Sequence, residues 1–194
     1  MLTLLWNDLI ENGLCKNVDL KNGSAVTVGS FDGPHRGHFA IFKEIFEYSK
    51  NHGTKNGIIT FERPVSALKE GKNYKGDIST LEERLKIFSS LGFDFSVVIH
   101  FDENFKNLSG QDFFSILKEK LNLKFIAEGI DFRCGHNGAF GKDEIEAFCA
   151  QNGIDSVFVE LVKDGGKRIS STMIRELLQK NDLNEAKRLL GIRN

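Results

Sequence analysis

Short apolar segments alternate with amphipathic segments along most of the chain, and this alternation restricts the fold more than any other feature. Five segments are predicted to be buried strands: residues 24–28, 57–61, 95–101, 124–128 and 155–161. Helices are predicted at residues 39–48, 81–91, 111–121, 142–151, 172–179 and 183–190. Strands separated by helical crossovers form a mainly parallel sheet. The sequence therefore predicts an α/β fold, a Rossmann-like parallel sheet flanked by helices.

Two of these helices carry recognisable start signals. Thr80 and Glu83 form a capping-box pattern, in which the threonine caps the helix and the glutamate reaches back to it. Gly92 follows the same helix and supplies a left-handed stop. Ser109 with Asp112 starts the next helix in a similar way. The connection at residues 62–78 lacks such signals and is predicted to be a polar, mobile loop.

Length and charge restrict the class of protein. The chain has 194 residues, which suits one domain, and 40% of them are hydrophobic. A formal net charge of −1 argues against a nucleic-acid partner. Asp8 and Glu11 interrupt the opening apolar residues, so neither a signal peptide nor a membrane span is predicted. The three cysteines, Cys15, Cys134 and Cys149, match no metal spacing and indicate reduced thiols in a cytoplasmic protein.

The segment VGSFDGPHRGH, residues 28–38, follows the first predicted strand directly. Parallel sheets bind ligands beyond the carboxyl ends of their strands. A helix begins near Gly37, and its unpaired N–H groups and dipole favour an anion. His35 and His38 are placed to donate hydrogen bonds to that anion. The segment is neither a Walker A loop nor a GxGxxG dinucleotide motif, and an ordinary turn is the alternative.

A second cluster of polar residues lies in KRISSTMIR, residues 167–175. Ser170 or Ser171 can cap the last long helix, and this alone would explain either serine. However, Lys167, Arg168 and Arg175 surround three hydroxyl groups, and a helix N-terminus with hydroxyls and an arginine suits a triphosphate. Arg175 falls one turn into the helix, so its guanidinium can reach back to that end. A solvated arginine is the alternative.

These segments carry a family resemblance. GSFDGPHRGH resembles the GxFDGxHxGH signature of prokaryotic FAD synthetases, which belong to the HxGH nucleotidyltransferases. GIDFRCG at residues 129–135 resembles the G-x-D-F-x-F-G segment of that family, and ISSTMIR resembles its ISSTxIR motif. Phe101-Asp102 with the Leu108-Ser109 and Phe113 that follow, and LLG at residues 189–191, also match in order. The resemblance covers nearly the whole chain.

The resemblance implies that residues 1–194 form a single FMN adenylyltransferase domain, without the riboflavin kinase domain of bifunctional members. Such a domain transfers AMP from ATP to FMN and releases FAD and pyrophosphate. It needs no covalent protein intermediate, because positioning and charge stabilisation can supply the catalysis. Mg²⁺ would be held mainly by the substrate phosphates, with no dedicated protein site.

The resemblance also implies roles for individual residues. The residues expected to act in catalysis are His35, His38, Ser171, Thr172 and Arg175. Those expected to bind ATP are Gly29, Ser30, Phe31, Gly37, His38, Ser170, Ser171 and Arg175. Those expected to contact the flavin are Asp32, Phe61, Asp131 and Phe132. Asp131 also fits a simple turn, and Phe132 also fits the core. Asp32 also fits a role that only shapes the first turn, and it is not expected to act as a general base.

Some positions depart from the family pattern, and two other functions stay open. Arg63 and Pro64 stand where the family often has a histidine between prolines, Cys134 replaces a usual phenylalanine, and Lys142 replaces a usual acidic residue. A related transferase could use CTP or a different phosphorylated acceptor. A nucleotide- or flavin-binding regulator without catalysis is the other alternative. The sequence does not indicate an oligomeric state.

Overall fold

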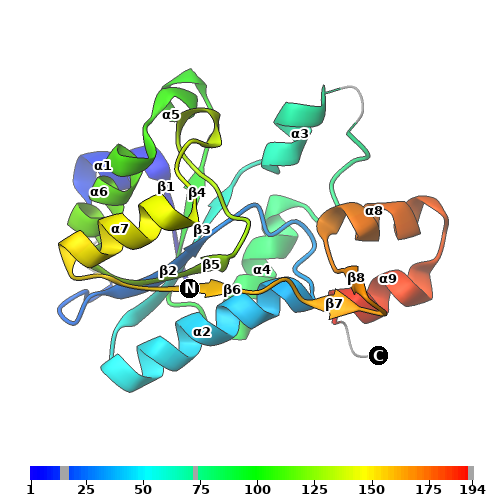
Figure 1. Cartoon of the computed structure of the whole chain (residues 1–194), viewed down its shortest axis with the longest axis horizontal. Helices are drawn as coiled ribbons and strands as arrows, with labels where there is room; N and C mark the ends of the chain where they lie inside the picture. The colour runs from blue at the N-terminus through cyan, green and yellow to red at the C-terminus, as the bar shows by residue number, and fades with distance from the viewer. Residues whose placement is uncertain (14–17, 72–73, 192–194) are drawn as a thin grey trace.

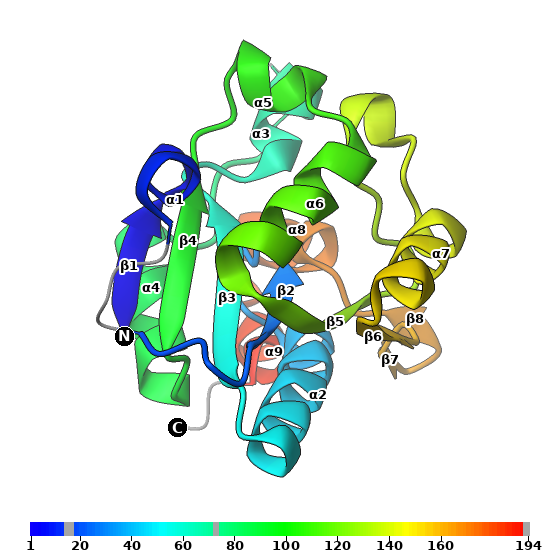
Figure 2. The same ribbon diagram turned by 90° about the vertical axis from the view of Figure 1, so that its left-hand side faces the viewer.

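The computed structural model describes residues 1–13, 18–71 and 74–191 (Figure 1). Six strands form one sheet in which every neighbouring pair is parallel. They are β1 (Leu2–Leu5), β2 (Ser24–Val28), β3 (Lys55–Phe61), β4 (Phe95–Ile99), β5 (Leu123–Gly129) and β6 (Asp155–Val159). Their order across the sheet is β1-β4-β3-β2-β5-β6, as Figure 2 shows. The predicted Rossmann-like parallel sheet is confirmed.

Helices cover both faces of this sheet. Residues of α1 (Trp6–Asn12), α6 (Gly110–Leu121) and α7 (Lys142–Asn152) pack with Val26, Ile59 and Val97 in one core cluster. Residues of α2 (Arg36–His52) and α4 (Leu81–Leu91) pack with Ala25, Ile58 and other strand residues in a second cluster. Successive strand residues thus enter opposite layers, because side chains alternate along a strand. Burial on both faces explains the continuous apolar runs in the sequence.

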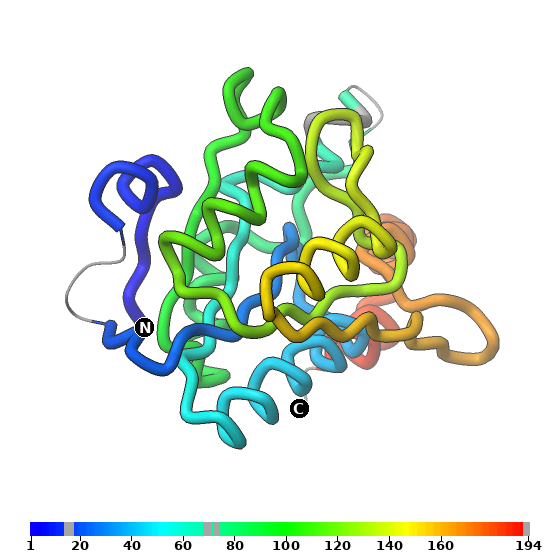
Figure 3. Tube along the Cα trace, turned by 60° about the vertical axis from the view of Figure 1, so that its left-hand side comes forward, coloured from blue at the N-terminus to red at the C-terminus, as the bar shows by residue number. Residues whose placement is uncertain are grey.

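The chain beyond β6 leaves the sheet and forms a small separate layer. The short strands β7 (Lys163–Asp164) and β8 (Lys167–Arg168) form an antiparallel hairpin that projects from the body of the molecule (Figure 3). Helices α8 (Ser171–Gln179) and α9 (Leu183–Leu190) then pack on each other around Ile169, Ile174, Ala186 and Leu189. This layer brings the N-terminus of α8 back to the carboxyl end of the sheet (Figure 1).

The predicted capping signals are confirmed. The Thr80 hydroxyl accepts from the Glu83 backbone N–H at 3.2 Å, and Glu83 accepts from the Thr80 N–H at 2.8 Å. Gly92 adopts the expected left-handed conformation with φ of +96°. Ser109 accepts from the Asp112 N–H at 3.0 Å and caps α6.

Several predicted boundaries were wrong. Helix α2 begins at Arg36, next to the start expected near Gly37 but three residues before the segment 39–48 that was predicted from periodicity. Strands β4 and β6 end two residues earlier than predicted. The connection at residues 62–78 contains a short helix, α3 (Val65–Glu70), and α5 (Glu103–Asn107) follows β4. Strand β1 was missed altogether, because its partner β4 lies far away in the chain and no local signal marks a strand of four residues.

The structure bears on two further predictions, those on the cysteines and on membrane spans. Cys134 and Cys149 are free thiols, whereas Cys15 lies outside the described residues. None of the helices that the structure describes is both long enough and apolar enough to cross a membrane.

Candidate functional site

A polar crevice of about 410 Å³ opens at the carboxyl ends of the strands, where β2 and β5 lie side by side. From this point the chain continues to β3 and β4 on one side of the sheet and to β6 on the other. Such a switch point is where open α/β sheets bind ligands. All but one of the residues singled out from the sequence line this crevice: Gly29, Ser30, Phe31, Asp32, His35, Gly37, His38, Asp131, Phe132, Ser170, Ser171, Thr172 and Arg175.

The two histidines lie together at the start of α2. Their rings stack with centroids 3.7 Å apart, and the His38 Nδ1 atom accepts a hydrogen bond from the His35 backbone N–H at 3.4 Å. Burial, assisted by the nearby Arg168 cation, lowers the pKa of His35 to about 4 and that of His38 well below its usual value. Both rings are therefore neutral near pH 7, and each carries one N–H donor.

The position of the His35 ring depends on Gly37. A Cβ atom at Gly37 would lie 3.1 Å from two atoms of this ring, closer than an ordinary contact. The His35 Nδ1 atom is buried without a hydrogen-bond partner in the described structure. Leaving a buried polar atom unpaired costs free energy, so this nitrogen suits a hydrogen bond to a group of a bound ligand.

The turn after β2 is held from beneath by a buried cation, Arg84 of α4. Its guanidinium donates to the Ser30 carbonyl at 2.7 Å, to the Phe61 carbonyl at 3.0 Å and to the Glu62 carbonyl at 3.0 Å. Arg84 is fully buried. It therefore joins the carboxyl ends of β2 and β3, and it fixes the turn in which Phe31 adopts a φ of +46°.

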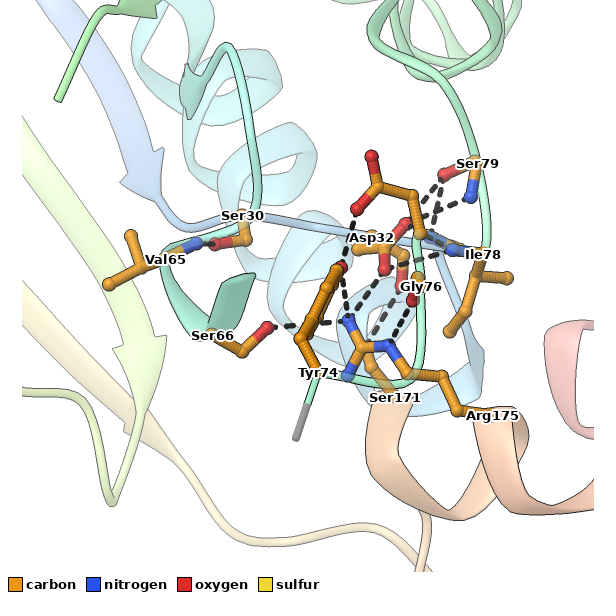
Figure 4. Close-up of polar contacts among 12 residues, drawn as sticks. Ser30, Asp32, Val65, Ser66, Tyr74, Gly76, Ile78, Ser79, Ser171 and Arg175 are labelled. Carbon is orange, nitrogen blue, oxygen red and sulfur yellow. Dashed lines mark hydrogen bonds and ion pairs between the residues drawn. The ribbon is translucent and has the colours of Figure 1, made fainter. Parts of the chain in front are cut away.

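Asp32 has the structural role in the turn after β2 that the sequence left open, and it also makes long-range contacts that the sequence did not predict. It is 1% exposed, and its carboxylate accepts from the backbone N–H groups of Ile78 at 3.0 Å and of Ser79 at 2.9 Å (Figure 4). It also pairs with the Arg175 guanidinium at 2.6 Å. Flavin contact by Asp32 stays a prediction, but its oxygens are already occupied by groups of the chain itself.

Arg175 is 5% exposed, which contradicts the alternative of a solvated arginine. Besides Asp32, its guanidinium donates to the Gly76 carbonyl at 2.9 Å and lies 5.0 Å from the centre of the Tyr74 ring (Figure 4). Arg175 therefore joins α8 to the segment before α4 and to the turn after β2. The contact of Arg175 with phosphate oxygens stays a prediction.

The N-terminus of α8 faces the same crevice. Of the two candidate serines, Ser170 is the cap, and its hydroxyl accepts from the Met173 N–H at 3.3 Å. The Ser171 hydroxyl instead donates to the Asp32 backbone carbonyl at 2.9 Å. Two helix N-termini, those of α2 and α8, thus meet at one place, which is a favourable environment for an anion.

Arg168 and Asp131 form an ion pair across the mouth of the crevice, with 2.5 Å between a guanidinium nitrogen and a carboxylate oxygen. About half of each side chain is exposed. Arg168 comes from β8 and Asp131 from the turn after β5, so the pair links the projecting hairpin to the sheet. Both groups can exchange partners when a charged ligand arrives, because an exposed ion pair contributes little to stability.

A second, larger cavity of about 1050 Å³ adjoins the crevice. It shares Val28, Gly29, Ser30, Phe132 and Arg133 with the first. Its wall is rich in aromatic side chains, namely Phe61, Phe101, Phe105, Phe113 and Phe132. Phe61 lines this cavity rather than the crevice. The sequence assigned flavin contact only to Phe61 and Phe132. Phe101 and Phe113 were noted as matches to the family pattern without a role, and Phe105 was not singled out.

The described residues contain no group of three or more His, Cys, Asp or Glu side chains that could hold a metal ion. The expectation that Mg²⁺ is held mainly by substrate phosphates stays a prediction. Two acidic residues of the crevice wall, Glu128 and Glu160, were not singled out from the sequence. Glu128, at the end of β5, was assigned only to a strand.

The FAD synthetase family model matches residues 18–173. The chain belongs to this family. An Escherichia coli (strain K12) relative of this FAD synthetase chain, named bifunctional riboflavin kinase/FMN adenylyltransferase, is 31% identical over 172 residues. That match covers 88% of the chain and 55% of the relative. A relative from Geobacillus thermodenitrificans (strain NG80-2) is 32% identical over 169 residues, which cover 87% of the chain and 90% of the relative.

Solved structures resemble this FAD synthetase chain as well. A structure described as a macrolide-efflux protein from Streptococcus pneumoniae matches with a TM-score of 0.81 and 25% identity, covering 98% of this chain and 60% of that one. A pantoate-beta-alanine ligase from Francisella tularensis matches with a TM-score of 0.52 and 13% identity, over 90% and 80% of the two chains, which shows a shared fold. The chain spans about half the length of the first curated relatives that it matches.

Proposed function

We propose that this chain is an FMN adenylyltransferase, which transfers AMP from ATP to FMN and yields FAD and pyrophosphate. Relatives at about 30% identity carry this activity in their names. One structural observation carries the proposal further: a crevice with two converging helix N-termini and many polar side chains adjoins an aromatic cavity and shares wall residues with it. The crevice suits the phosphates of the nucleotide, and the cavity suits the ring of the flavin.

The nucleotide occupies the polar crevice in this proposal. The N-termini of α2 and α8 face its phosphates, and the neutral rings of His35 and His38 each offer one N–H donor. Hydroxyls of Ser171 and Thr172 lie at the same end of α8. Arg168 supplies an exposed positive charge in the crevice wall, after releasing Asp131. This set binds phosphate oxygens without a Walker A loop.

The flavin ring occupies the aromatic cavity. Five phenylalanine side chains offer flat apolar surfaces for a tricyclic ring. The cavity joins the crevice at Gly29, Ser30 and Phe132. An FMN molecule with its ring in the cavity therefore presents its phosphate towards the nucleotide, at the junction.

The reaction needs no protein nucleophile. An oxygen of the FMN phosphate attacks the α-phosphorus of ATP in line, a P–O bond forms, and the bond to the departing pyrophosphate breaks with its electron pair. Negative charge shifts towards the leaving group during this step. Donors fixed in advance, such as the N–H groups of His35 and His38, stabilise that charge without reorganising. Mg²⁺ bound to the substrate phosphates supplies additional charge neutralisation.

We place this activity in the cytoplasm, within a single domain and without a nucleic-acid partner. The free thiols of Cys134 and Cys149 suit a reducing compartment. The nearly neutral charge of the chain does not suit a polyanionic partner.

The test is product analysis with purified protein. ATP, Mg²⁺ and FMN are incubated with the chain, and nucleotides and flavins are separated by chromatography. Formation of FAD and pyrophosphate in equal amounts supports the proposal. Parallel reactions contain CTP instead of ATP, or other phosphorylated acceptors instead of FMN. Product in those reactions alone would indicate a related transferase, and no product with any pair, despite ligand binding, would indicate a binding protein.

A further inference from the structure

Glu128 lies at the point where the sheet divides. The ladder between β2 and β5 ends at the pair Val26 and Ile126. On their outer sides the two strands continue, since Val28 still pairs with Ile59 of β3 and Glu128 with Phe158 of β6. The two central strands therefore separate over their last residues, and the crevice opens there. Glu128 belongs to the wall of that crevice.

The Glu128 side chain replaces the missing strand contact. Its Oε1 atom accepts from the Val28 backbone N–H at 2.6 Å and from the Thr27 hydroxyl at 3.4 Å. Without it, the Val28 N–H would face a gap at the carboxyl end of β2. The carboxyl group thus holds the last residue of β2, directly before the Gly29–Ser30 turn on which the nucleotide site is built.

The second oxygen of this carboxyl group, Oε2, makes no contact of this kind with the described residues. In the part of the chain that the structure describes, no group hydrogen-bonds the Oε2 atom, and no cation forms an ion pair with Glu128. The residue is 2% exposed. Burial raises the pKa of this carboxyl well above its usual value, although the Val28 N–H opposes the shift. A neutral carboxylic acid whose Oε1 accepts two hydrogen bonds carries its proton on Oε2.

We propose that Glu128 positions the nucleotide as a hydrogen-bond donor, holding Val28 through Oε1 and offering the Oε2–H group to an oxygen of the bound nucleotide. This role rests on the proposed binding of a nucleotide in the crevice. A carboxylate would repel the phosphates in this place, whereas a carboxylic acid attracts them. The chain thereby gains a donor in the wall of the crevice, in addition to the donors of the two helix N-termini.

Three variants test the proposal by calorimetric titration with ATP alone. Glu128→Gln keeps an acceptor for Val28 and replaces the O–H donor by an N–H donor, so we expect the Kd for ATP to stay within about threefold of wild type. Glu128→Met keeps the length but has neither group, and we expect the Kd to rise about tenfold or more, the effect of losing a hydrogen bond to a charged group. Thr27→Val removes only the 3.4 Å contact to Oε1 and leaves binding unchanged. Wild-type affinity in Glu128→Met overturns the proposal.

A spectroscopic measurement on the wild-type protein covers the case in which Glu128→Met does not fold. Infrared difference spectra with and without ATP report the carbonyl stretch of a protonated carboxyl group. We expect ATP to shift this band, and we expect the signal to be absent in Glu128→Gln. A silent band in wild type saturated with ATP contradicts the proposal.

The outcomes also separate this inference from the proposed function. If the infrared band shifts with ATP but no FAD forms with FMN, the acceptor is wrong and the role of Glu128 stands. If FAD forms while the band stays silent and Glu128→Met binds ATP normally, the function stands and the role of Glu128 fails. If wild type binds no nucleotide, both fail.

Discussion

The stacked rings of His35 and His38 are basic groups that the folded protein keeps neutral near pH 7. The cost of charging them arises from burial and from the neighbouring Arg168. Neutral rings act as hydrogen-bond donors whose direction is fixed by packing. The Nδ1 atom of His35 has no hydrogen-bond partner in the described structure, so the protein alone does not satisfy this ring. If the proposed roles of these rings hold, stability and catalysis depend on the same two side chains.

Acid should destabilise the fold through His35. The pKa of His35 is lowered from 6.5 to about 4 in the folded protein, so between these pH values the unfolded chain binds a proton that the folded chain does not. This contribution to stability is complete above pH 6.5 and is lost as the pH falls towards 4. We expect a loss of about 3 kcal/mol in the free energy of unfolding across this range. Urea unfolding at both ends of the range measures it.

The matched variant for this measurement is His35→Asn, which cannot titrate. Its free energy of unfolding should fall less than that of wild type over the same pH range, by about the same 3 kcal/mol. Parallel pH curves for the two proteins would show that His35 is not the responsible group.

The N–H group of His38 should matter for turnover. Removal of one fixed donor from a developing negative charge costs about 2.7–4 kcal/mol, so His38→Ala should lower kcat by roughly 10²- to 10³-fold. The control is His52→Ala, at the exposed far end of α2. Steady-state kinetics of FAD formation measure both variants. An unchanged kcat/KM in folded His38→Ala would remove this histidine from the reaction.

At the scale of elements, the buried pair of Asp32 and Arg175 connects parts of the chain that are far apart in sequence. Asp32 belongs to the turn after β2, Arg175 to α8, and both bind the segment that precedes α4 (Figure 4). The turn after β2, the segment before α4 and helix α8 therefore meet at one ion pair in the wall of the crevice. A change in one partner should affect both folding and ligand binding.

Asp32→Asn should destabilise the protein by about 3–5 kcal/mol, because it leaves the Arg175 cation buried without its counter-charge. Arg175→Lys keeps the charge but loses the planar fork that reaches Asp32 and the Gly76 carbonyl together, so its melting temperature should fall as well. Arg36→Lys, in the exposed pair with Asp164, is the control. Thermal melting measures all three, and a wild-type melting temperature in both site variants would contradict the structural role.

Local patterns sufficed for most elements of the fold. Capping residues such as Thr80 and Ser109 marked helix starts, and the apolar strands were visible because burial on both faces leaves an unbroken apolar run. Strand β1 was missed, and the pairing of Asp32 with Arg175 could not be foreseen, because both depend on contacts between distant parts of the chain. The crevice residues were found through their motifs, whereas Glu128 looked like the last residue of a strand.

At the scale of the whole molecule, the proposed function places the flavin ring and the reacting phosphates in two adjoining cavities. Aromatic residues surround the larger cavity, and polar groups surround the smaller one. A ligand that fills only one of the two cavities, and lacks the group that reacts, should therefore bind without reacting.

Riboflavin is such a ligand, since it has the ring of FMN but no phosphate to attack ATP. We expect it to inhibit FAD formation competitively with FMN and to yield no adenylylated product. Initial rates at several FMN and riboflavin concentrations, followed by chromatography, measure both effects. An adenylylated riboflavin product would show that the nucleophile is a hydroxyl group, and the assignment of the phosphate to the junction of the cavities would then be wrong.

The edge strand β1 has a consequence for how the protein is made. Leu2 pairs with Phe95, so β1 can join the sheet only after β4 exists. A ribosome adds about 5–20 residues per second, and the interval between the synthesis of the two strands is therefore roughly 5–20 s. During that time the newborn chain carries a strand with no neighbour, which is a template for pairing with other chains. Sheet assembly therefore cannot start at β1, and this strand, made before the other five strands of the sheet, must wait for β4.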